Sequence, residues 1–278
     1  MRTDIAFDFL DKRKDDTPFF LFMSYRAPHS FEGPIRDTLL YADKGWPEIE
    51  RVHAAKITLL DKQVGRLLEK LKEIDQLDNT LILFTSDNGP HYAKDGHGLE
   101  FFDSNGKFKG GKRDLYEGGI RVPLIAYWNQ NIASGTVSDH ISSFQDIMPT
   151  FSEIIGFEKS NDSDGISFLP TLLSKKQKKH KFLNWEFQLS GWFQTIPDGG
   201  FRQSIRIENW KAVRYNLDSS IELYNLKDDP GEIKDIAKLH PDIIERADYI
   251  FKNSRTDALG FPYGGVKQNH RSMDVFEY

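Results

Sequence analysis

The most constraining feature of the sequence is a long amphipathic segment followed directly by a short apolar one. Between about Glu48 and Leu77, apolar residues recur at spacings of three and four, which predicts a long helix with one buried face. The apolar run Leu81–Thr85 comes next and predicts a buried strand, as do the runs Phe19–Met23 and Val122–Trp128. Apolar strands that alternate with helices favour an α/β sheet covered on both faces.

The pattern changes toward the C-terminus, where short runs are separated by turn residues such as Asp229-Pro230-Gly231 and predict an antiparallel meander. The predicted strands are Phe182–Phe187, Gln203–Ile207, Lys211–Tyr215 and Ile221–Leu226. A helix from Pro241 to about Lys252 is expected to pack on this small sheet. We therefore expect two domains, residues 1–175 with the α/β sheet and residues 176–278 with the antiparallel strands and their helix.

Three further segments precede the meander. A helix is expected from about Ser142 to Ile155, with Gly156 as the residue that ends it. The basic run Lys175–Lys181 is most simply a solvated loop. Between Thr85 and about Leu115 lies a long irregular stretch, and loops of that length tend to be functional.

Composition excludes several classes of protein. With 38% hydrophobic and 28% charged residues the chain reads as an ordinary globular protein, and 278 residues can bury a sizeable core. A net charge of −5 gives no general attraction to nucleic acid or anionic membranes. No apolar run is long enough for a membrane span, and Asp4, Asp8, Asp11 and Asp15 interrupt the place of a signal peptide's apolar region. The absence of cysteine excludes disulfides, thiolate metal sites and a cysteine nucleophile in this chain.

Polar residues that could take part in binding or catalysis follow the predicted strands. Asp87 and Asn88 come directly after one strand, where the pair is either a turn or a source of hard oxygen ligands for Ca²⁺ or Mg²⁺. His29 follows another strand and is either a loop histidine or a site residue, whereas Lys112 lies among glycines that could admit an anion or is simply exposed. Because ligands collect at the carboxyl ends of strands in open α/β sheets, the set fits a metal-assisted site for a tetrahedral oxyanion ester.

The sequence that carries these residues resembles the formylglycine-dependent sulfatases of the alkaline-phosphatase superfamily, over about residues 5 to 265. The two most specific stretches are Tyr116–Pro123, which reads YEGGIRVP, and Glu222–Glu232 with its Asp-Pro-Gly. The other matching stretches are Phe19–His29, His53–Leu71, Phe84–Pro90, Ser104–Gly106 and Asp139–Gly156. The resemblance implies a sulfatase-like sheet flanked by helices, incomplete in this chain, with a small C-terminal antiparallel sheet packed by a helix.

The resemblance also implies roles for individual residues. Asp87 and Asn88 match a pair of Ca²⁺ ligands, and Lys112 matches the lysine that holds the sulfate oxygens. His29 matches the histidine beside the ester oxygen, which must be protonated to assist departure of the leaving group. Sulfated carbohydrate is the implied substrate, with His91, His97, Glu186 and Gln188 as the candidate substrate-binding residues; the alternative is loop histidines and core positions.

The chain departs from the family pattern in two respects. It contains no Asp-Asp pair after an early apolar strand and no Cys-x-Pro-x-Arg or Ser-x-Pro-x-Arg motif, whose cysteine or serine becomes formylglycine in the family. The expectation is therefore a C-terminal part of a sulfatase with an incomplete Ca²⁺ site, inactive alone. It is expected to be either a fragment of a longer chain or one piece of a split gene, partnered in the second case by a separate N-terminal sulfatase segment. The alternatives are a phosphoester or phosphonate hydrolase of the same superfamily and a non-catalytic protein that binds sulfated glycans. The family is often periplasmic or secreted, but the sequence itself does not fix a compartment.

Overall fold

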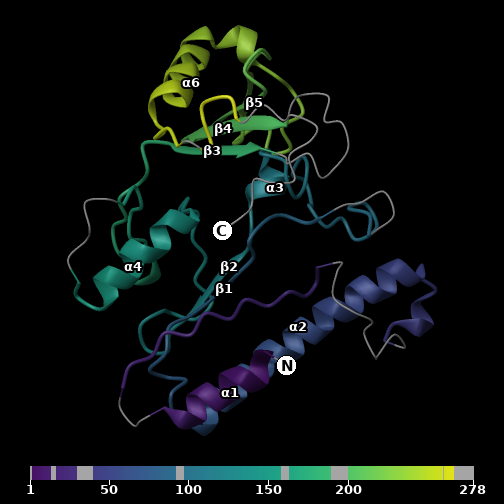
Figure 1. Ribbon diagram of the computed structural model, residues 1–278, viewed down its shortest axis with the longest axis vertical. Helices are drawn as coiled ribbons and strands as arrows, with labels where there is room; N and C mark the ends of the chain where they lie inside the picture. Colours follow the sequence, from purple (N-terminus) through teal and green to yellow (C-terminus); the bar gives the residue numbers. More distant parts are fainter. Residues whose placement is uncertain are drawn as a thin grey trace. The chain divides into compact units, whose positions relative to one another are not determined.

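The computed structural model describes residues 2–13, 17–29, 40–91, 97–157, 163–188, 200–258 and 260–265, and Figure 1 labels its helices and strands. The chain forms two compact units. The first unit comprises Met1–Phe84, Tyr92–Phe102 and Ile125–Thr136. The second comprises Thr85–His91, Asp103–Leu124 and Val137–Tyr278. The domain boundary after residue 175 stays a prediction, but Thr85–His91, Asp103–Leu124 and the residues from Val137 onward group with the C-terminal sheet.

Two helices dominate the first unit, α1 (Arg2–Lys12) and α2 (Glu48–Glu73), and Figure 1 shows them side by side. The helix expected from Glu48 is confirmed and ends at Glu73, with a short 3₁₀ turn, η1 (Ala42–Lys44), before it. Buried Ala6 and Leu10 form the apolar side of α1. Ion pairs tie the helices together, Asp4 to Arg66 at 2.8 Å and Asp11 to Lys70 at 2.7 Å.

The strands expected after α2 and before residue 128 are also present. They are β1 (Ile82–Thr85) and β2 (Leu124–Tyr127), which pair in a two-stranded sheet. The expectation that this sheet is covered on both faces is wrong for β2, because Leu124, Ile125 and Tyr127 are all exposed. A sheet with two strands has few neighbours that could cover such side chains, and exposed apolar strand residues agree with the incomplete sheet implied by the resemblance.

The strand predicted at Phe19–Met23 is not formed. Residues 17–26 carry no strand assignment, and Phe20 and Phe22 are 70% and 79% exposed. A β-strand needs a neighbouring strand to accept and donate its backbone hydrogen bonds, and the described residues supply none for this segment. The segment is apolar, but it has no partner strand within the described part of the chain.

The second unit contains the predicted antiparallel meander. Its strands run in the order β3-β4-β5-β6, and each pairs with the next one in the sequence. Their bounds are β3 (Leu183–Gln188), β4 (Phe201–Ile207), β5 (Trp210–Tyr215) and β6 (Glu222–Asn225). The register places Glu186 opposite Gln203 and Gln203 opposite Arg214, so these three side chains share one face of the sheet.

Helix α6 (Pro241–Asn253) covers one face of this sheet, as predicted and as Figure 1 shows. Pro241 opens the helix, where its missing N–H costs nothing. The apolar core between helix and sheet consists of Ile205, Ile207, Ala212, Leu223, Ala247, Ile250 and Phe251. A short 3₁₀ turn, η3 (Ala237–Leu239), leads into the helix.

Between β2 and β3 the second unit holds a small helical region. The predicted helix begins as a 3₁₀ turn, η2 (Phe144–Asp146), and continues as α4 (Ile147–Ile154), with Gly156 beyond its end at φ +70°. Two short helices, α3 (Glu117–Ile120), which lies before β2, and α5 (Leu169–Leu172), which follows α4, were not predicted. The basic run Lys175–Lys181 is a loop as expected, except that its His180 side chain is only 9% exposed and contacts Asp146 at 2.9 Å.

Candidate active site in the second unit

The loop after β1 carries the predicted metal ligands. Asp87 is exposed and Asn88 is half-buried. The Ser86 hydroxyl donates to the Asn88 carbonyl at 3.1 Å, and the Asn88 Nδ2 donates to the Gly89 carbonyl at 2.8 Å. Because the amide nitrogen is used within the loop, the side-chain oxygen Oδ1 is the Asn88 atom suited to a cation. The loop is therefore a compact turn that presents a carboxylate and an amide oxygen, so the turn and ligand interpretations are compatible.

Backbone hydrogen bonds join this loop to the segment that carries Lys112. The Gly89 N–H donates to the Gly119 carbonyl at 2.9 Å, and the Lys112 N–H donates to the Pro90 carbonyl at 2.8 Å. The residues predicted to hold a metal ion and the lysine predicted to hold an oxyanion thus lie on adjacent loops of the same unit. The second unit brings Asp87, Asn88 and Lys112 together despite the 25 residues between Asp87 and Lys112.

Three glycines make this close approach possible. A Cβ added at Gly89 would lie 1.9 Å from the Gly118 carbonyl oxygen. At Gly118 it would lie 2.3 Å from the Gly110 oxygen, and at Gly119 it would lie 2.1 Å from the Asp114 oxygen. None of the three has a positive φ, so glycine is required here by contact between backbones and not by an unusual backbone conformation.

Behind the glycines lies a buried network of charges. Glu117, the first residue of α3, is 3% exposed and pairs with Lys211 of β5 at 3.1 Å and Arg206 of β4 at 3.0 Å. Lys211 is fully buried. Burial lowers the pKa of Lys211, while the Glu117 charge acts in the opposite direction. Burial raises the pKa of Glu117, but the charges of Lys211 and Arg206 outweigh it and leave that pKa below its ordinary value. The turn that carries Gly118 and Gly119 is thereby tied to the C-terminal sheet.

Glu232 fixes the same turn from a different segment. Its carboxylate Oε2 accepts the backbone N–H of Glu117 at 2.7 Å, and its side chain is completely buried. The other oxygen, Oε1, is buried and has no hydrogen-bond partner among the described residues. Burial raises the pKa of Glu232 to about 7, against the opposing charge of Lys211. Glu232 therefore takes up a proton in the folded protein at a pH where the unfolded chain would not.

This titration predicts a pH dependence of stability. The folded protein holds a proton on Glu232 between pH 4.5 and about 7 that the unfolded chain releases, so its contribution to the free energy of unfolding falls as the pH rises through that window. The loss amounts to about 3 kcal/mol at most. We expect Glu232→Gln, which cannot titrate, to flatten this part of the profile. The measurement is urea unfolding of both proteins at several pH values, with the amide exchange of β5 as the readout. If the free energy of unfolding depends on pH equally in both proteins, the assignment to Glu232 is contradicted.

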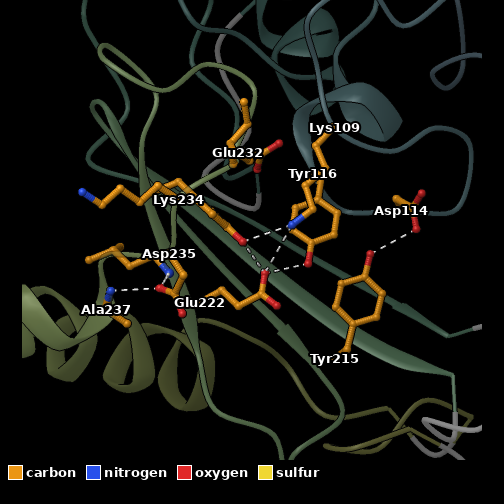
Figure 2. A network of polar contacts seen from close by, with 12 residues as sticks. Lys109, Asp114, Tyr116, Tyr215, Glu222, Glu232, Lys234, Asp235 and Ala237 are labelled. Carbon is orange, nitrogen blue, oxygen red and sulfur yellow. Dashed lines mark hydrogen bonds and ion pairs between the residues drawn. The ribbon is translucent and has the colours of Figure 1, made fainter. Parts of the chain in front are cut away.

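A second polar cluster lies on the same side of the sheet (Figure 2). The Glu222 carboxylate accepts hydrogen bonds from the hydroxyls of Tyr116 and Tyr224, each at 2.6 Å. The Lys109 ammonium group lies 3.9 Å from the centre of the Tyr116 ring and donates to the Tyr224 hydroxyl at 3.1 Å. Burial and the Glu222 charge both raise the pKa of Tyr116, so it stays a protonated donor. The cluster joins the loop before α3 to β6.

His29 belongs to the first unit. Its backbone N–H donates to the Arg26 carbonyl at 2.8 Å, and its own carbonyl accepts the Lys56 ammonium group at 3.1 Å. These contacts hold the end of the Phe19–His29 segment against α2. The convergence of His29 with Lys112 and Asp87 stays a prediction.

The two candidate substrate-binding histidines occupy different units. His91 follows the Asp87 loop directly in the second unit and is half-buried. His97 lies in the first unit, where its ring is buried, bonds to Glu50 and stacks on His53 with 3.8 Å between ring centres. Burial, together with the charge of His97, lowers the pKa of His53 to about 4. His97 therefore packs against His53 and Glu50 of α2, and its contact with substrate stays a prediction.

Glu186 and Gln188 lie on β3. Both oxygens of the Glu186 carboxylate have partners within the second unit, Gln203 at 2.6 Å and Arg255 at 2.9 Å. Gln188 approaches the C-terminal segment, where a Cβ on Gly265 would meet its side-chain oxygen at 2.6 Å. The role of both residues in substrate binding also stays a prediction. Glu186 would have to bind substrate while keeping, or by giving up, its contacts with Gln203 and Arg255.

The residues that sequence reasoning missed are the charged ones behind the loops. Glu117 stands inside the specific stretch Tyr116–Pro123 and Glu232 closes the stretch that contains Asp-Pro-Gly, so their position in the motifs was the available signal. Lys211 carried no such signal, because a lysine in a short strand normally faces water. Only the structure shows that it pairs with a residue 94 positions away.

The donor set around Asp87 is suited to a hard cation but is small. Among the described residues, the structure contains no group of three His, Asp or Glu side chains that could hold a metal ion. Asp87 and Asn88 supply carboxylate and amide oxygens, which Ca²⁺ prefers, although it usually takes six to eight. The residues present therefore fit part of a Ca²⁺ site.

The α/β fold with its small C-terminal antiparallel sheet is that of a sulfatase-type protein, and comparison with known families agrees. Residues 3–157 match the family model Sulfatase, and residues 106–246 match the model N-sulphoglucosamine sulphohydrolase, C-terminal. The first match alone covers more than half of the chain, so the chain belongs to the sulfatase family. The resemblance stated from the motifs is confirmed.

Individual relatives show the same relationship. The chain is 36% identical over 202 residues to Uncharacterized sulfatase YdeN of Escherichia coli (strain K12), covering 70% of this chain and 35% of that protein. It is 30% identical over 250 residues to human N-acetylgalactosamine-6-sulfatase, covering 82% and 46%. The crystal structure of Ps i-CgsB in complex with k-i-k-neocarrahexaose matches with a TM-score of 0.77 at 26% identity, covering 91% of this chain and 53% of the other. The chain thus spans about a third to a half of these relatives, and the sulfatase-like fold is confirmed.

Within the described residues, no helix combines the length and the apolar character needed to cross a membrane.

Proposed function

We propose that this chain supplies the sulfate-binding and part of the metal-binding apparatus of a sulfuric ester hydrolase. The observation that carries the proposal is the joining of the Asn88 loop and the Lys112 segment by backbone hydrogen bonds and by contacts that only glycine permits. Such packing keeps the two loops in fixed positions, as an oxyanion-binding site requires. Membership of the sulfatase family and the names of the relatives support the choice of a sulfate ester.

Each residue then has a chemical task. The Lys112 ammonium group stabilises the charge on the sulfuryl oxygens, which grows as the ester bond breaks. His29, when protonated, donates a proton to the departing ester oxygen. Asp87 and Asn88 would hold Ca²⁺, which supplies positive charge for binding the sulfate group. The buried Glu117 and Glu232 keep the turn behind these loops in place without touching the substrate.

The nucleophile is proposed to come from outside these 278 residues. The chain has no cysteine that could become formylglycine, and it corresponds to about a third to a half of its relatives. We propose a separate sulfatase segment as the partner. The exposed Phe20, Phe22 and Ile125 support this, because apolar side chains in extended segments are suited to pairing with further strands.

The proposed substrate is a sulfated carbohydrate. Support comes from human N-acetylgalactosamine-6-sulfatase and from the neocarrahexaose complex, both similar to this chain. His91, His97, Glu186 and Gln188 are the residues proposed to bind the sugar.

The direct experiment is turnover of an aryl sulfate and a sulfated sugar, with phosphate monoesters as the comparison. We expect no turnover by the 278 residues alone, since a strong nucleophile is required for attack at sulfur. Turnover should appear when a sulfatase segment that carries formylglycine is added, and Lys112→Ala should then reduce it by about a thousandfold. Phosphate esters turned over in preference to sulfate esters, or activity unchanged in Lys112→Ala, would overturn the proposal.

Calcium binding tests the metal assignment without any need for activity. With Asp87 and Asn88 as its only assigned ligands, the chain should bind Ca²⁺ weakly, and Asp87→Ala should abolish the heat of binding measured by calorimetry. Asp218→Ala is the matched control, since Asp218 is an exposed carboxylate of the same unit in a different loop. Tight binding that survives Asp87→Ala would show that the ion binds elsewhere.

A further inference from the structure

Lys112 lies within a tight turn whose shape depends on Asp114. The Gly111 N–H donates to the Asp114 carboxylate oxygen Oδ2 at 3.0 Å, and the Asp114 N–H donates to the Gly111 carbonyl at 2.9 Å. Arg113, between them, has a φ of +81°, a conformation that costs free energy for any residue other than glycine. A turn that contains such a residue needs contacts from outside to keep its shape.

Those contacts come from β4 and β5. The Arg202 Nη1 donates to the Arg113 carbonyl at 2.7 Å and to the Asp114 Oδ1 at 3.2 Å. The Tyr215 hydroxyl donates to the same Oδ1 at 3.1 Å, a contact that Figure 2 shows. The Arg202 guanidinium group also lies over the Tyr215 ring, 4.4 Å from its centre. Side chains from two strands therefore hold the residues on the C-terminal side of Lys112.

The charges in this group matter as much as its shape. Asp114 places a carboxylate two positions from Lys112, and an uncompensated negative charge there would oppose the binding of an anion. Arg202 compensates that charge, and both side chains are largely buried, at 12% and 14% exposed. Burial and the Asp114 charge raise the pKa of Tyr215, so its hydroxyl remains a donor at ordinary pH.

We propose that Asp114, Arg202 and Tyr215 are positioning residues that hold Lys112 in the geometry and electrostatic environment needed to bind a tetrahedral oxyanion. The proposal rests on the proposed role of Lys112 in binding sulfate and adds residues that act through the turn. None of the three is placed in contact with the substrate. The small C-terminal sheet is thereby part of the anion-binding apparatus, in addition to packing against α6.

The test is an NMR titration of the full 278-residue chain with inorganic sulfate, followed at the Gly111 and Lys112 amides. Tyr215→Phe removes one hydroxyl, and Tyr249→Phe removes an exposed hydroxyl from α6 as the matched control. We expect Lys112→Ala to abolish the response and Tyr215→Phe to weaken sulfate affinity about fivefold. Tyr249→Phe should leave the affinity unchanged.

A charge-specific pair of variants separates positioning from simple loss of structure. Arg202→Gln removes the cation that pairs with Asp114 and should weaken sulfate binding at least tenfold. Adding Asp114→Asn restores neutrality, so the double variant should bind sulfate more tightly than Arg202→Gln alone, although it has lost more native contacts. A purely structural role predicts the opposite order.

The outcomes are distinct. If Lys112→Ala abolishes binding but Tyr215→Phe and Arg202→Gln bind like the unaltered chain, the positioning role is wrong and the proposed function of Lys112 stands. If Lys112→Ala itself binds sulfate normally, the proposed function fails and the positioning role fails with it. Weaker binding in both variants, with partial recovery in the double variant, supports the proposal.

Discussion

Replacing Gly89 by alanine is expected to destabilise the second unit by about 3 kcal/mol, the upper end of the usual range for overpacking. The new methyl group would lie 1.9 Å from the Gly118 carbonyl oxygen, far inside van der Waals contact. The atoms it meets belong to backbone, so no side chain can rotate away to relieve the clash. The two loops must separate, and the hydrogen bond from the Gly89 N–H to the Gly119 carbonyl is lost with them.

The measurement is urea unfolding of the second unit, accompanied by Ca²⁺ calorimetry. Gly260→Ala is the matched control, since a Cβ at that position meets nothing within 4 Å and φ is not positive. It should leave stability unchanged or raise it by up to about 1 kcal/mol through a lower entropy of the unfolded chain. A Gly89→Ala protein as stable as Gly260→Ala would mean that the loops are not packed as described.

Glu117→Gln is expected to have an effect at least as large, about 3–5 kcal/mol, because it removes one member of a buried ion pair. Lys211 is fully buried, and without the carboxylate at 3.1 Å its ammonium charge has lost its main compensation. Replacing both partners, as in Glu117→Gln with Lys211→Met, should recover most of the loss, because the fully buried ammonium charge is then gone and Arg206, the other partner of Glu117, is partly exposed.

The control uses the same glutamate and a different partner. Arg121 lies 3.7 Å from the Glu117 carboxylate but is 56% exposed, so Arg121→Gln should cost less than about 1 kcal/mol. Thermal and urea unfolding of the four proteins give the comparison. A double variant no more stable than Glu117→Gln alone would contradict the ion-pair explanation and indicate that the glutamate acts through shape.

The helices and strands that could be predicted from the sequence alone are those in which apolar residues recur at a regular spacing. The apolar spacing of α2 and α6 and the short runs of β4 and β5 each correspond to one buried face, which is why their bounds agree with the structure to within a few residues. The same reasoning failed at Phe19–Met23, because apolar composition reports a tendency to be buried and does not reveal whether a partner strand is present.

The candidate site was predictable only in part, for a related reason. Asp87, Asn88 and Lys112 stand in motifs, and their loops do meet in the second unit. The charged support behind them depends on contacts across the chain, such as Glu117 with Lys211 and Asp114 with Arg202. A single sequence shows each of these residues as an ordinary charged side chain, and only the paired strands show which charge faces which.

The contacts at Gly89, Gly118 and Gly119 have a consequence for how this family can diverge. Residues that touch through their side chains can change together, because a larger group at one position is offset by a smaller one at the other. Here each glycine touches a backbone carbonyl, which every amino acid possesses. No second substitution can make room for a first, so these positions should be invariant and show no covariation among homologues that keep the site. Searches for coevolving pairs would therefore overlook the contacts that bring its two loops together.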